Sequence, residues 1–252
     1  MLKSLDYDQT RQPAGYVAGR PLGAGSAEAW AEIFAANAPP QRPLTVLDLG
    51  SGTGRFSGLL ANTLGGPVYG VEPSERMRAV AAAQAAEGVS FLAGRAEAIP
   101  MADDACDLVL MFLSFHHVRD RRAAAAEIAR VLRPGGRVFI RNQFSDRFPD
   151  IDWHEHFPSA RRIEMQMFPS TGEVEAPFAE VGLKRIDLVS FDEEFHDSRR
   201  DLAERLKHRA ISTFEHLDEA EIVEGLARLD AAAAAETTPQ PVIARSDLMV
   251  LG

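Results

Sequence analysis

The stretch that decides the fold is residues 46–56, which read Val-Leu-Asp-Leu-Gly-Ser-Gly-Thr-Gly-Arg-Phe. Its apolar start is typical of a buried strand, and three glycines at alternate positions lead into a segment compatible with a helix to about Leu64. Glycine suits such a turn because the backbone takes positive φ and a ligand can approach without a Cβ in the way. The following helix offers unsatisfied N–H groups at its start. The stretch therefore predicts a nucleotide-binding turn.

The spacing of the glycines excludes two common phosphate-binding loops. A dinucleotide fingerprint has its third glycine three residues after the second, where this chain has Arg55. A Walker loop needs Gly-Lys-Ser/Thr, and no lysine stands between residues 4 and 183. The remaining pattern, Asp-x-Gly-x-Gly-x-Gly, resembles the first motif of class I S-adenosylmethionine-dependent methyltransferases, where it lies under the methionine half of a cofactor without phosphate. This resemblance implies cofactor contacts at Asp48, Gly50, Ser51, Gly52 and Gly54.

A second strand over residues 68–71 ends in Glu72-Pro73-Ser74. A carboxylate at the tip of the second strand can accept hydrogen bonds from both ribose hydroxyls, so Glu72 is predicted to bind the cofactor, with Pro73 beside it. Ser74 is expected to cap the next helix. Met77 in that helix points either toward the adenine or into the core.

The segments after the next two strands resemble the type 11 methyltransferases, which include enzymes of ubiquinone and menaquinone biosynthesis. Residues 94–101 are similar to the family's Gly-Asp-Ala-Glu-x-Leu-Pro, but Arg95 replaces an Asp that often contacts the adenine amino group. Residues 113–118 are similar to its Leu-His-His-Val stretch. Together the matches cover residues 46–141. They imply further cofactor contacts at Ala96, Glu97, Phe112 and Leu113.

The resemblance implies an α/β fold, a Rossmann-like doubly wound sheet of about seven strands that is mostly parallel with an antiparallel last strand. We expect one methyltransferase domain over residues 1–252. It comprises an N-terminal cap segment (1–43), a cofactor-binding core (44–141) and two lid segments (142–168 and 197–236).

The C-terminal part departs from the family, which usually returns by a hairpin to its last strand. Ser170 with Glu173 predicts a capping box, and strands are expected at about 183–191 and 242–251. Between them, apolar residues at helical spacing predict two helices, one lined by Leu202, Leu206, Ala210 and Phe214 and one by Ile222, Leu226 and Leu229. We interpret this insertion as a helical lid over the substrate, with an oligomer contact as the alternative.

The N-terminal segment carries Tyr7, Tyr16 and Arg20. In similar small-molecule methyltransferases a segment of this kind folds over the cofactor, which implies that Arg20 is a cofactor contact; a disordered tail is the alternative. Ser26 is expected to cap a helix that contains Trp30.

Methyl transfer from a sulfonium is an in-line displacement, so the protein mainly aligns the reactants, and a general base is needed only when the acceptor has a proton to lose. His116 and His117 follow a strand end where ligands bind in open α/β sheets, so they are either candidate bases or packed histidines. The Asp/His/Glu side chains of residues 150–156 could hold a metal, but they lie in one irregular stretch; we interpret them as part of a polar lid and predict no metal.

Nucleic acid is an unfavourable substrate for this chain, because its formal net charge is −10 and its arginine pairs stand among carboxylates. The motifs of nucleic-acid methyltransferases, Asn/Asp-Pro-Pro-Tyr/Phe and a Pro-Cys nucleophile, are also missing from the sequence. A small, partly apolar acceptor is predicted, methylated on oxygen, nitrogen or carbon. The predicted substrate pocket is lined by Tyr7, Tyr16, Trp153, His154 and Phe168.

Other features of the sequence predict where the protein is located and in what oligomeric state it occurs. It contains no run of about eighteen apolar residues and no signal peptide, so we expect a cytoplasmic protein without membrane partners, as a monomer or homodimer. The single cysteine, Cys106, is expected in the core. The predicted function is S-adenosylmethionine-dependent methyl transfer with S-adenosylhomocysteine as product. The alternative is a protein that binds the cofactor without methyl transfer, either regulatory or catalysing another reaction such as cyclisation.

Overall fold

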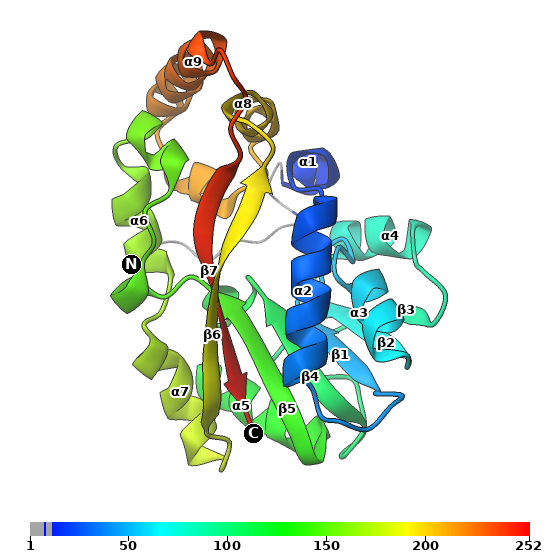
Figure 1. The fold of residues 1–252 in the computed structure, drawn as a ribbon. Helices are drawn as coiled ribbons and strands as arrows, with labels where there is room; N and C mark the ends of the chain where they lie inside the picture. Colours follow the sequence, from blue (N-terminus) through cyan, green and yellow to red (C-terminus); the bar gives the residue numbers. More distant parts are fainter. Residues whose placement is uncertain (1–7, 9–11) are drawn as a thin grey trace.

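A seven-stranded sheet in the order β3-β2-β1-β4-β5-β7-β6 forms the centre of the molecule (Figure 1). The computed structural model describes residue 8 and residues 12–252. The strands β1 to β5 run parallel, whereas β7 is antiparallel to both β5 and β6. The predicted fold class is therefore confirmed. The strands are β1 (Val46–Leu49), β2 (Val68–Glu72), β3 (Val89–Ala93), β4 (Cys106–Phe112), β5 (Leu132–Asn142), β6 (Arg185–His196) and β7 (Val242–Leu251).

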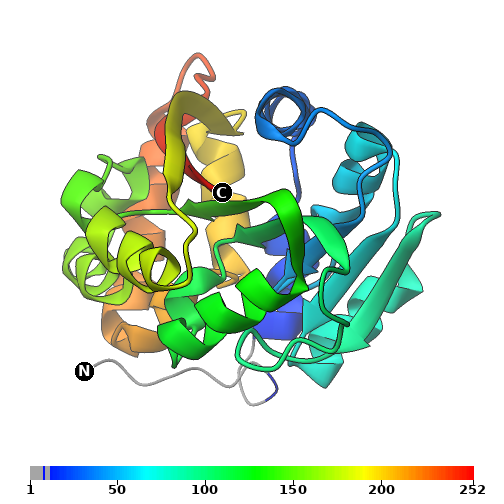
Figure 2. The same ribbon diagram turned by 90° about the horizontal axis from the view of Figure 1, so that it is seen from below.

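Helices cover both faces of the sheet (Figure 2). One core contains apolar residues of α2 and α3, and the core on the opposite face contains residues of α5 and α7. The helices are α1 (Gln12–Gly19), α2 (Ala24–Asn37), α3 (Ser57–Leu64), α4 (Glu75–Ala83), α5 (Arg121–Val131), α6 (Ala160–Met167), α7 (Thr171–Glu180), α8 (Arg199–Lys207) and α9 (Glu219–Ala235). No helix in the described part of the chain has the length and apolar character needed to cross a bilayer.

The near-continuous apolar sequence of β4 follows from its central position. Val109 and Met111 pack in the core with α5 and α7, whereas Leu108 and Leu110 pack in the core with α2 and α3. A parallel strand covered on both faces has no solvent side to which polar residues could turn. The buried strand therefore holds its carboxyl-terminal residue, Phe112, in a fixed position at the end of the sheet.

Two of the three predicted helix caps are confirmed, and the third is wrong. Ser74 Oγ accepts a hydrogen bond from the Met77 backbone N–H, and Ser170 with Glu173 forms the predicted capping box of α7. Ser26 does not cap α2, because that helix already begins at Ala24. Its hydroxyl instead donates a hydrogen bond to the buried Glu193 carboxylate, 167 residues later in the sequence.

Beyond the ends of the other strands, β6 and β7 continue as a two-stranded ribbon toward α8 and α9 (Figure 1). The predicted strand 183–191 is thus too short: β6 reaches His196, because its pairing with β7 extends to Val242. The two predicted helices of the insertion are confirmed as α8 and α9. Ala210 and Phe214 follow α8, and Phe214 lies in a short 3₁₀ segment at Ser212–His216.

The insertion has a hydrophobic core of its own. Trp153 and Phe157 from residues 142–168 pack there with Phe214, and the apolar faces of both insertion helices complete it. The two segments predicted as lids therefore form one packed unit.

Two glycines bring α1 close to the insertion. A Cβ on Gly15 would lie 2.6 Å from the backbone oxygen of His208, and a Cβ on Gly19 would lie 2.6 Å from the Cβ of Ala210. Such a separation is far below van der Waals contact, so this approach requires glycine at both positions.

Candidate active site

Two cavities lie side by side at the carboxyl ends of the parallel strands. The first, about 350 Å³, opens among the glycine turn, the tip of β2 and the end of β4. The second, about 170 Å³, lies between the sheet and the insertion. Tyr16, Phe112, Leu113 and His117 line both. Leu113 has φ +52°, a left-handed conformation that residues other than glycine adopt mainly where the surroundings hold them.

The glycine turn forms one wall of the first cavity. Gly50 and Gly52 have φ values of +76° and +57°. A Cβ on Gly50 would lie 2.5 Å from the Cβ of Ser114, so this position tolerates no side chain. A Cβ on Gly52 would meet nothing within 4 Å, and the backbone of this residue faces open space. The turn thus exposes its backbone to the cavity, as the sequence predicts.

Glu72 is held rigidly at the tip of β2. Its Oε2 accepts a hydrogen bond from the Gly52 backbone N–H at 3.0 Å, and its Oε1 accepts one from the Ser74 backbone N–H at 2.9 Å. The residue is 6% exposed and lines the first cavity. Burial raises the pKa of Glu72, and the two backbone hydrogen bonds oppose that effect. The carboxylate is therefore oriented before any ligand arrives.

Three residues of the predicted cofactor set stand behind the cavity wall, not in it: Asp48, Ser51 and Gly54. Asp48 Oδ2 accepts a hydrogen bond from Ser57 Oγ at 2.6 Å, which joins the end of β1 to the first residue of α3. Burial raises the pKa of Asp48 to about 6. A Cβ on Gly54 would lie 2.6 Å from the Phe91 ring. These residues support the glycine turn on the side away from the cavity.

The remaining predicted cofactor residues of the core, Pro73, Met77, Ala96 and Glu97, line the first cavity. Met77 is also 2% exposed, so it packs in the interior as well as lining the cavity, and its contact with the adenine stays a prediction. Glu97 accepts hydrogen bonds from the backbone N–H groups of Arg119 and Asp120, just before α5.

Sequence reasoning missed Asp8 in this wall. Its Oδ1 accepts a hydrogen bond from Ser74 Oγ at 2.6 Å, and its carboxylate also accepts from backbone N–H groups at the start of α4. These hydrogen bonds lower the pKa of Asp8, that from Ser74 most. The signal in the sequence is an acidic residue in the N-terminal segment, which can accept hydrogen bonds from the first N–H groups of a helix far along the chain.

The second cavity gathers residues that the sequence assigned to different roles. Tyr16, Trp153 and Phe168 of the predicted substrate pocket line it, and so does Arg20, which was expected at the cofactor. Tyr7 lies outside the described residues. His154 stands behind the wall, where its Nε2 lies 2.9 Å from Glu164 Oε2.

Glu164, which the sequence did not single out, lines the second cavity and is 3% exposed. Its Oε1 accepts a hydrogen bond from Thr213 Oγ1 at 2.7 Å. The sequence signal for Glu164 is an acidic residue on the apolar side of an amphipathic helix. This signal is weak, because many acidic residues at such positions are only half-buried.

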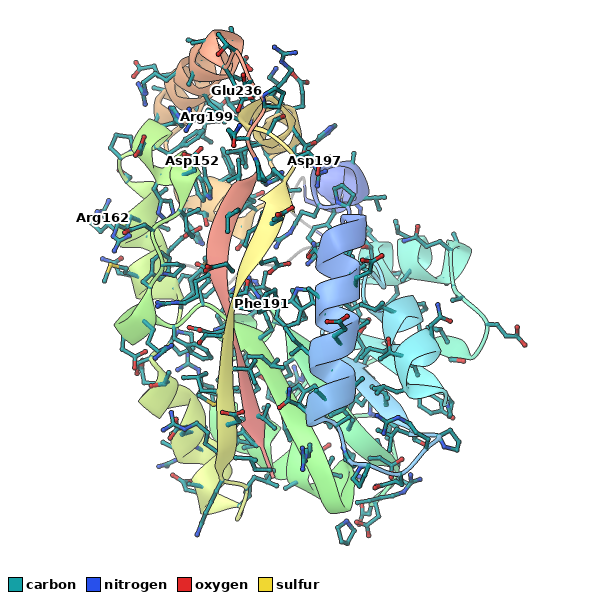
Figure 3. All side chains as sticks on the ribbon, in the orientation of Figure 1. Asp152, Arg162, Phe191, Asp197, Arg199 and Glu236 are labelled. Atoms are coloured by element: carbon teal, nitrogen blue, oxygen red, sulfur yellow. The ribbon has the colours of Figure 1, made fainter. Side chains whose placement is uncertain are left out.

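The metal-capable side chains of residues 150–156 are distributed among separate partners. Asp152 pairs with Arg199 of α8 at 3.0 Å, and both lie in the part of the molecule that contains α8 and α9 (Figure 3). Asp150 pairs with Arg161 at 3.2 Å, and His154 with Glu164. Their common effect is to attach this segment to its neighbours.

Both candidate bases line the second cavity as neutral imidazoles. His116 Nδ1 lies 3.0 Å from Asn142 Oδ1, an acceptor, so in this orientation of the amide Nδ1 carries the proton and Nε2 is the basic nitrogen. Burial, followed by the neighbouring His117, lowers the pKa of His116 well below its usual value. Burial lowers the pKa of His117 to about 4.

The lowered pKa of His117 predicts a pH-dependent stability. The unfolded chain takes up a proton near pH 6.5 and the folded chain only near pH 4, so this contribution is complete above pH 6.5 and is lost as the pH falls toward 4. Between pH 7 and pH 5 the wild-type free energy of unfolding should fall by about 2 kcal/mol more than that of His117→Gln.

Urea denaturation of both proteins at the two pH values measures this difference. The two proteins must be compared with each other because Asp48 has a raised pKa and therefore adds stability as the pH falls below about 6. This effect opposes the loss of stability caused by the histidine. An equal change in both proteins would contradict the prediction.

Comparisons with known proteins agree with this geometry. A family model described as a methyltransferase domain matches residues 47–140. The chain is 36% identical over 115 residues to the ubiquinone/menaquinone biosynthesis C-methyltransferase UbiE of Acidiphilium cryptum, covering 44% of this chain and 46% of that protein. It is 31% identical over 181 residues to the O-methyltransferase resE of Aspergillus sclerotiorum, covering 66% and 63%.

A solved structure extends the likeness to most of the fold. It is a putative methyltransferase from an antibiotic biosynthesis pathway of Anabaena variabilis, with a TM-score of 0.72, 21% identity, and coverage of 88% of this chain and 96% of that one. The chain spans less than half the length of the UbiE relative and less than two thirds of the resE relative. The glycine turn, the acidic strand tip and the family match together identify residues 47–140 as a class I S-adenosylmethionine-dependent methyltransferase domain.

Proposed function

We propose that this protein transfers a methyl group from S-adenosylmethionine to a small-molecule acceptor by in-line displacement. The observation that carries the proposal is the meeting of two cavities at Phe112, Leu113 and His117. An in-line displacement needs a donor and a nucleophile on opposite sides of the transferred group. Two adjoining chambers that share one short wall meet this requirement.

The first cavity fits the cofactor by its chemistry. Glu72 offers a fixed carboxylate for the two ribose hydroxyls, and the open backbone at Gly52 suits the methionine half. Met77 and Ala96 offer apolar surface for the adenine. When bound, S-adenosylmethionine supplies a methyl group activated by a sulfonium. The residues of the turn, including Asp48 behind it, would hold and orient that group.

The second cavity fits a small, partly aromatic or apolar acceptor. Phe112, Trp153 and Phe168 line it and exclude water from the nucleophile. The neutral imidazoles of His116 and His117 can accept a hydrogen bond from an acceptor that must lose a proton, such as a hydroxyl, although their lowered pKa values make them weak bases. For acceptors without such a proton, their role is to position the nucleophile.

Two measurements test the proposal. Isothermal titration should give saturable binding of S-adenosylmethionine and S-adenosylhomocysteine but not of NAD. Incubation with methyl-labelled S-adenosylmethionine and a panel of small metabolites should transfer label to at least one acceptor. Binding of NAD without S-adenosylmethionine would refute the proposal. Cofactor binding without transfer to a broad panel would favour the alternative, a binding protein or an enzyme for another reaction on the same fold.

A further inference from the structure

Four arginines line the second cavity, and three of them, Arg20, Arg55 and Arg141, have no ion pair with a carboxylate closer than 3.7 Å among the described residues. Arg55 Nη1 donates a hydrogen bond to the Arg20 backbone oxygen at 3.3 Å. Arg55 and Arg141 both lie near the Phe112 ring, 5.5 and 5.2 Å from its centroid. Burial lowers the pKa of Arg55 and of Arg141 to about 10, so both are cationic at neutral pH. The cavity therefore has a cationic side next to its shared wall.

The nearest carboxylate, that of Glu193, does not form a close ion pair with these arginines. Glu193 Oε1 accepts hydrogen bonds from Trp30 Nε1, at 2.8 Å, and from Ser26 Oγ. Its Oε2 accepts one from Ser246 Oγ at 2.5 Å. Arg141 Nη2 stands 3.7 Å from Oε2, beyond hydrogen-bond distance. The carboxylate is thus largely engaged by neutral donors.

The charge balance of the second cavity leaves one excess positive charge. Its charged lining consists of Arg20, Arg55, Arg141, Arg205, Glu164 and Glu193. Arg205 is neutralised by Asp201 at 2.8 Å, outside the lining. Three guanidiniums then face two carboxylates, and the three histidines of the lining all have pKa values lowered by burial. A ligand with a single negative charge restores the balance.

Arg141 adds a directional argument. It is 1% exposed at the end of β5, and Nη2 donates to Ser246 Oγ at 2.7 Å. Its Nε and Nη1 have no acceptor among residue 8 and residues 12–252. Buried donors in folded proteins nearly always have a partner, and an ionised acceptor such as a carboxylate makes the strongest hydrogen bonds with guanidinium N–H groups.

We propose that the methyl acceptor carries a carboxylate, which Arg141 binds with the help of Arg55 and Arg20. This inference rests on the proposed function and names the substrate class of its second cavity. A carboxylate could also come from the methionine half of the cofactor. The three arginines line the second cavity and not the first, which assigns them to the acceptor.

The test uses matched pairs of probes that differ only in charge: 4-hydroxybenzoate with 4-hydroxybenzamide, and hexanoate with hexanamide. Each is titrated calorimetrically into the full chain, with and without saturating S-adenosylhomocysteine. At least one acid should bind about tenfold or more tightly than its amide. Arg141→Met should lose most of this preference, and Arg141→Lys, which keeps the charge without the planar edge, should show an intermediate preference.

Arg205→Met is the matched control, since it removes a guanidinium of the same cavity whose charge is already paired, and it should keep the preference for the acid. The affinity of Arg141→Met for S-adenosylhomocysteine should equal that of the wild type. A loss of that affinity with the acid preference intact would assign the arginine to the cofactor and overturn the inference. Equal binding of acids and amides to the wild type, or failure of every acid to bind, would overturn it as well.

Two further outcomes remain decisive. If Arg141→Met does not fold, the wild-type pairs and Arg141→Lys carry the test. If S-adenosylhomocysteine does not bind the wild type, the proposed function fails, while the comparison of acid and amide on the free protein still decides whether the second cavity selects a carboxylate.

Discussion

The Glu72→Ala variant should bind S-adenosylmethionine about 10- to 150-fold more weakly than the wild type, a loss of about 1.5–3 kcal/mol. The carboxylate is the group we assign to the ribose hydroxyls, and its two oxygens are already fixed by the Gly52 and Ser74 backbone N–H groups. Removing it deletes a charged acceptor and loosens the turn at once. Titration calorimetry of both proteins measures the effect.

Glu75→Ala serves as the control for Glu72→Ala. Glu75 is three residues away and exposed in the first turn of α4, so its removal changes the net charge equally without touching the first cavity. Its dissociation constant should match that of the wild type. Thermal melts should show that Glu72→Ala remains folded, because the site is a strand tip. Equal cofactor affinity in wild type and Glu72→Ala would refute the ribose assignment.

Replacement of residues 197–236 by a short linker should abolish turnover while leaving most of the cofactor affinity. The insertion supplies Leu202, Leu206 and Thr213 to the second cavity and no lining residue to the first. An acceptor that is no longer enclosed loses its alignment with the methyl group, the main source of rate in this chemistry. Labelled transfer and calorimetry on the shortened protein measure the two effects separately.

Limited proteolysis gives a second measurement that does not depend on the solubility of the shortened protein. If the insertion closes over the acceptor, cleavage within residues 197–236 should slow when cofactor and acceptor are both present. Equal cleavage with and without ligands, together with full activity of the shortened protein, would mean that the segment is a buttress or an oligomer contact.

Features that depend on neighbouring residues in the sequence could be predicted. The glycine turn, the acidic end of β2 and the Ser170–Glu173 capping box are each set by a few consecutive residues, and the structure has them where the sequence indicates. The mostly parallel sheet with an antiparallel last strand was expected from the resemblance of residues 46–141 to a known family, and the structure confirms it. The roles of these residues toward a ligand remain predictions.

Features that depend on residues far apart in sequence could not be predicted. Ser26 looks like a helix cap by its local sequence, but its partner Glu193 comes from β6, an edge strand of the sheet that is far along the chain. Arg141 ends an apolar strand segment, and only the pairing of β5 with β7 brings it to Ser246. Such contacts are decided by strand pairing and by packing between elements far apart in the sequence, for which local patterns carry no signal.

The close approach of α1 to the insertion has a consequence for how two ligands influence each other. Tyr16 lies between Gly15 and Gly19 on α1 and lines both cavities, while these glycines press the helix against the chain at His208 and Ala210. If a ligand in the first cavity orders α1, it should also order the part of the second cavity that α1 and Ala210 line. In that case each ligand should, by linkage, raise the affinity for the other by the same factor, and we expect cooperative binding within one chain.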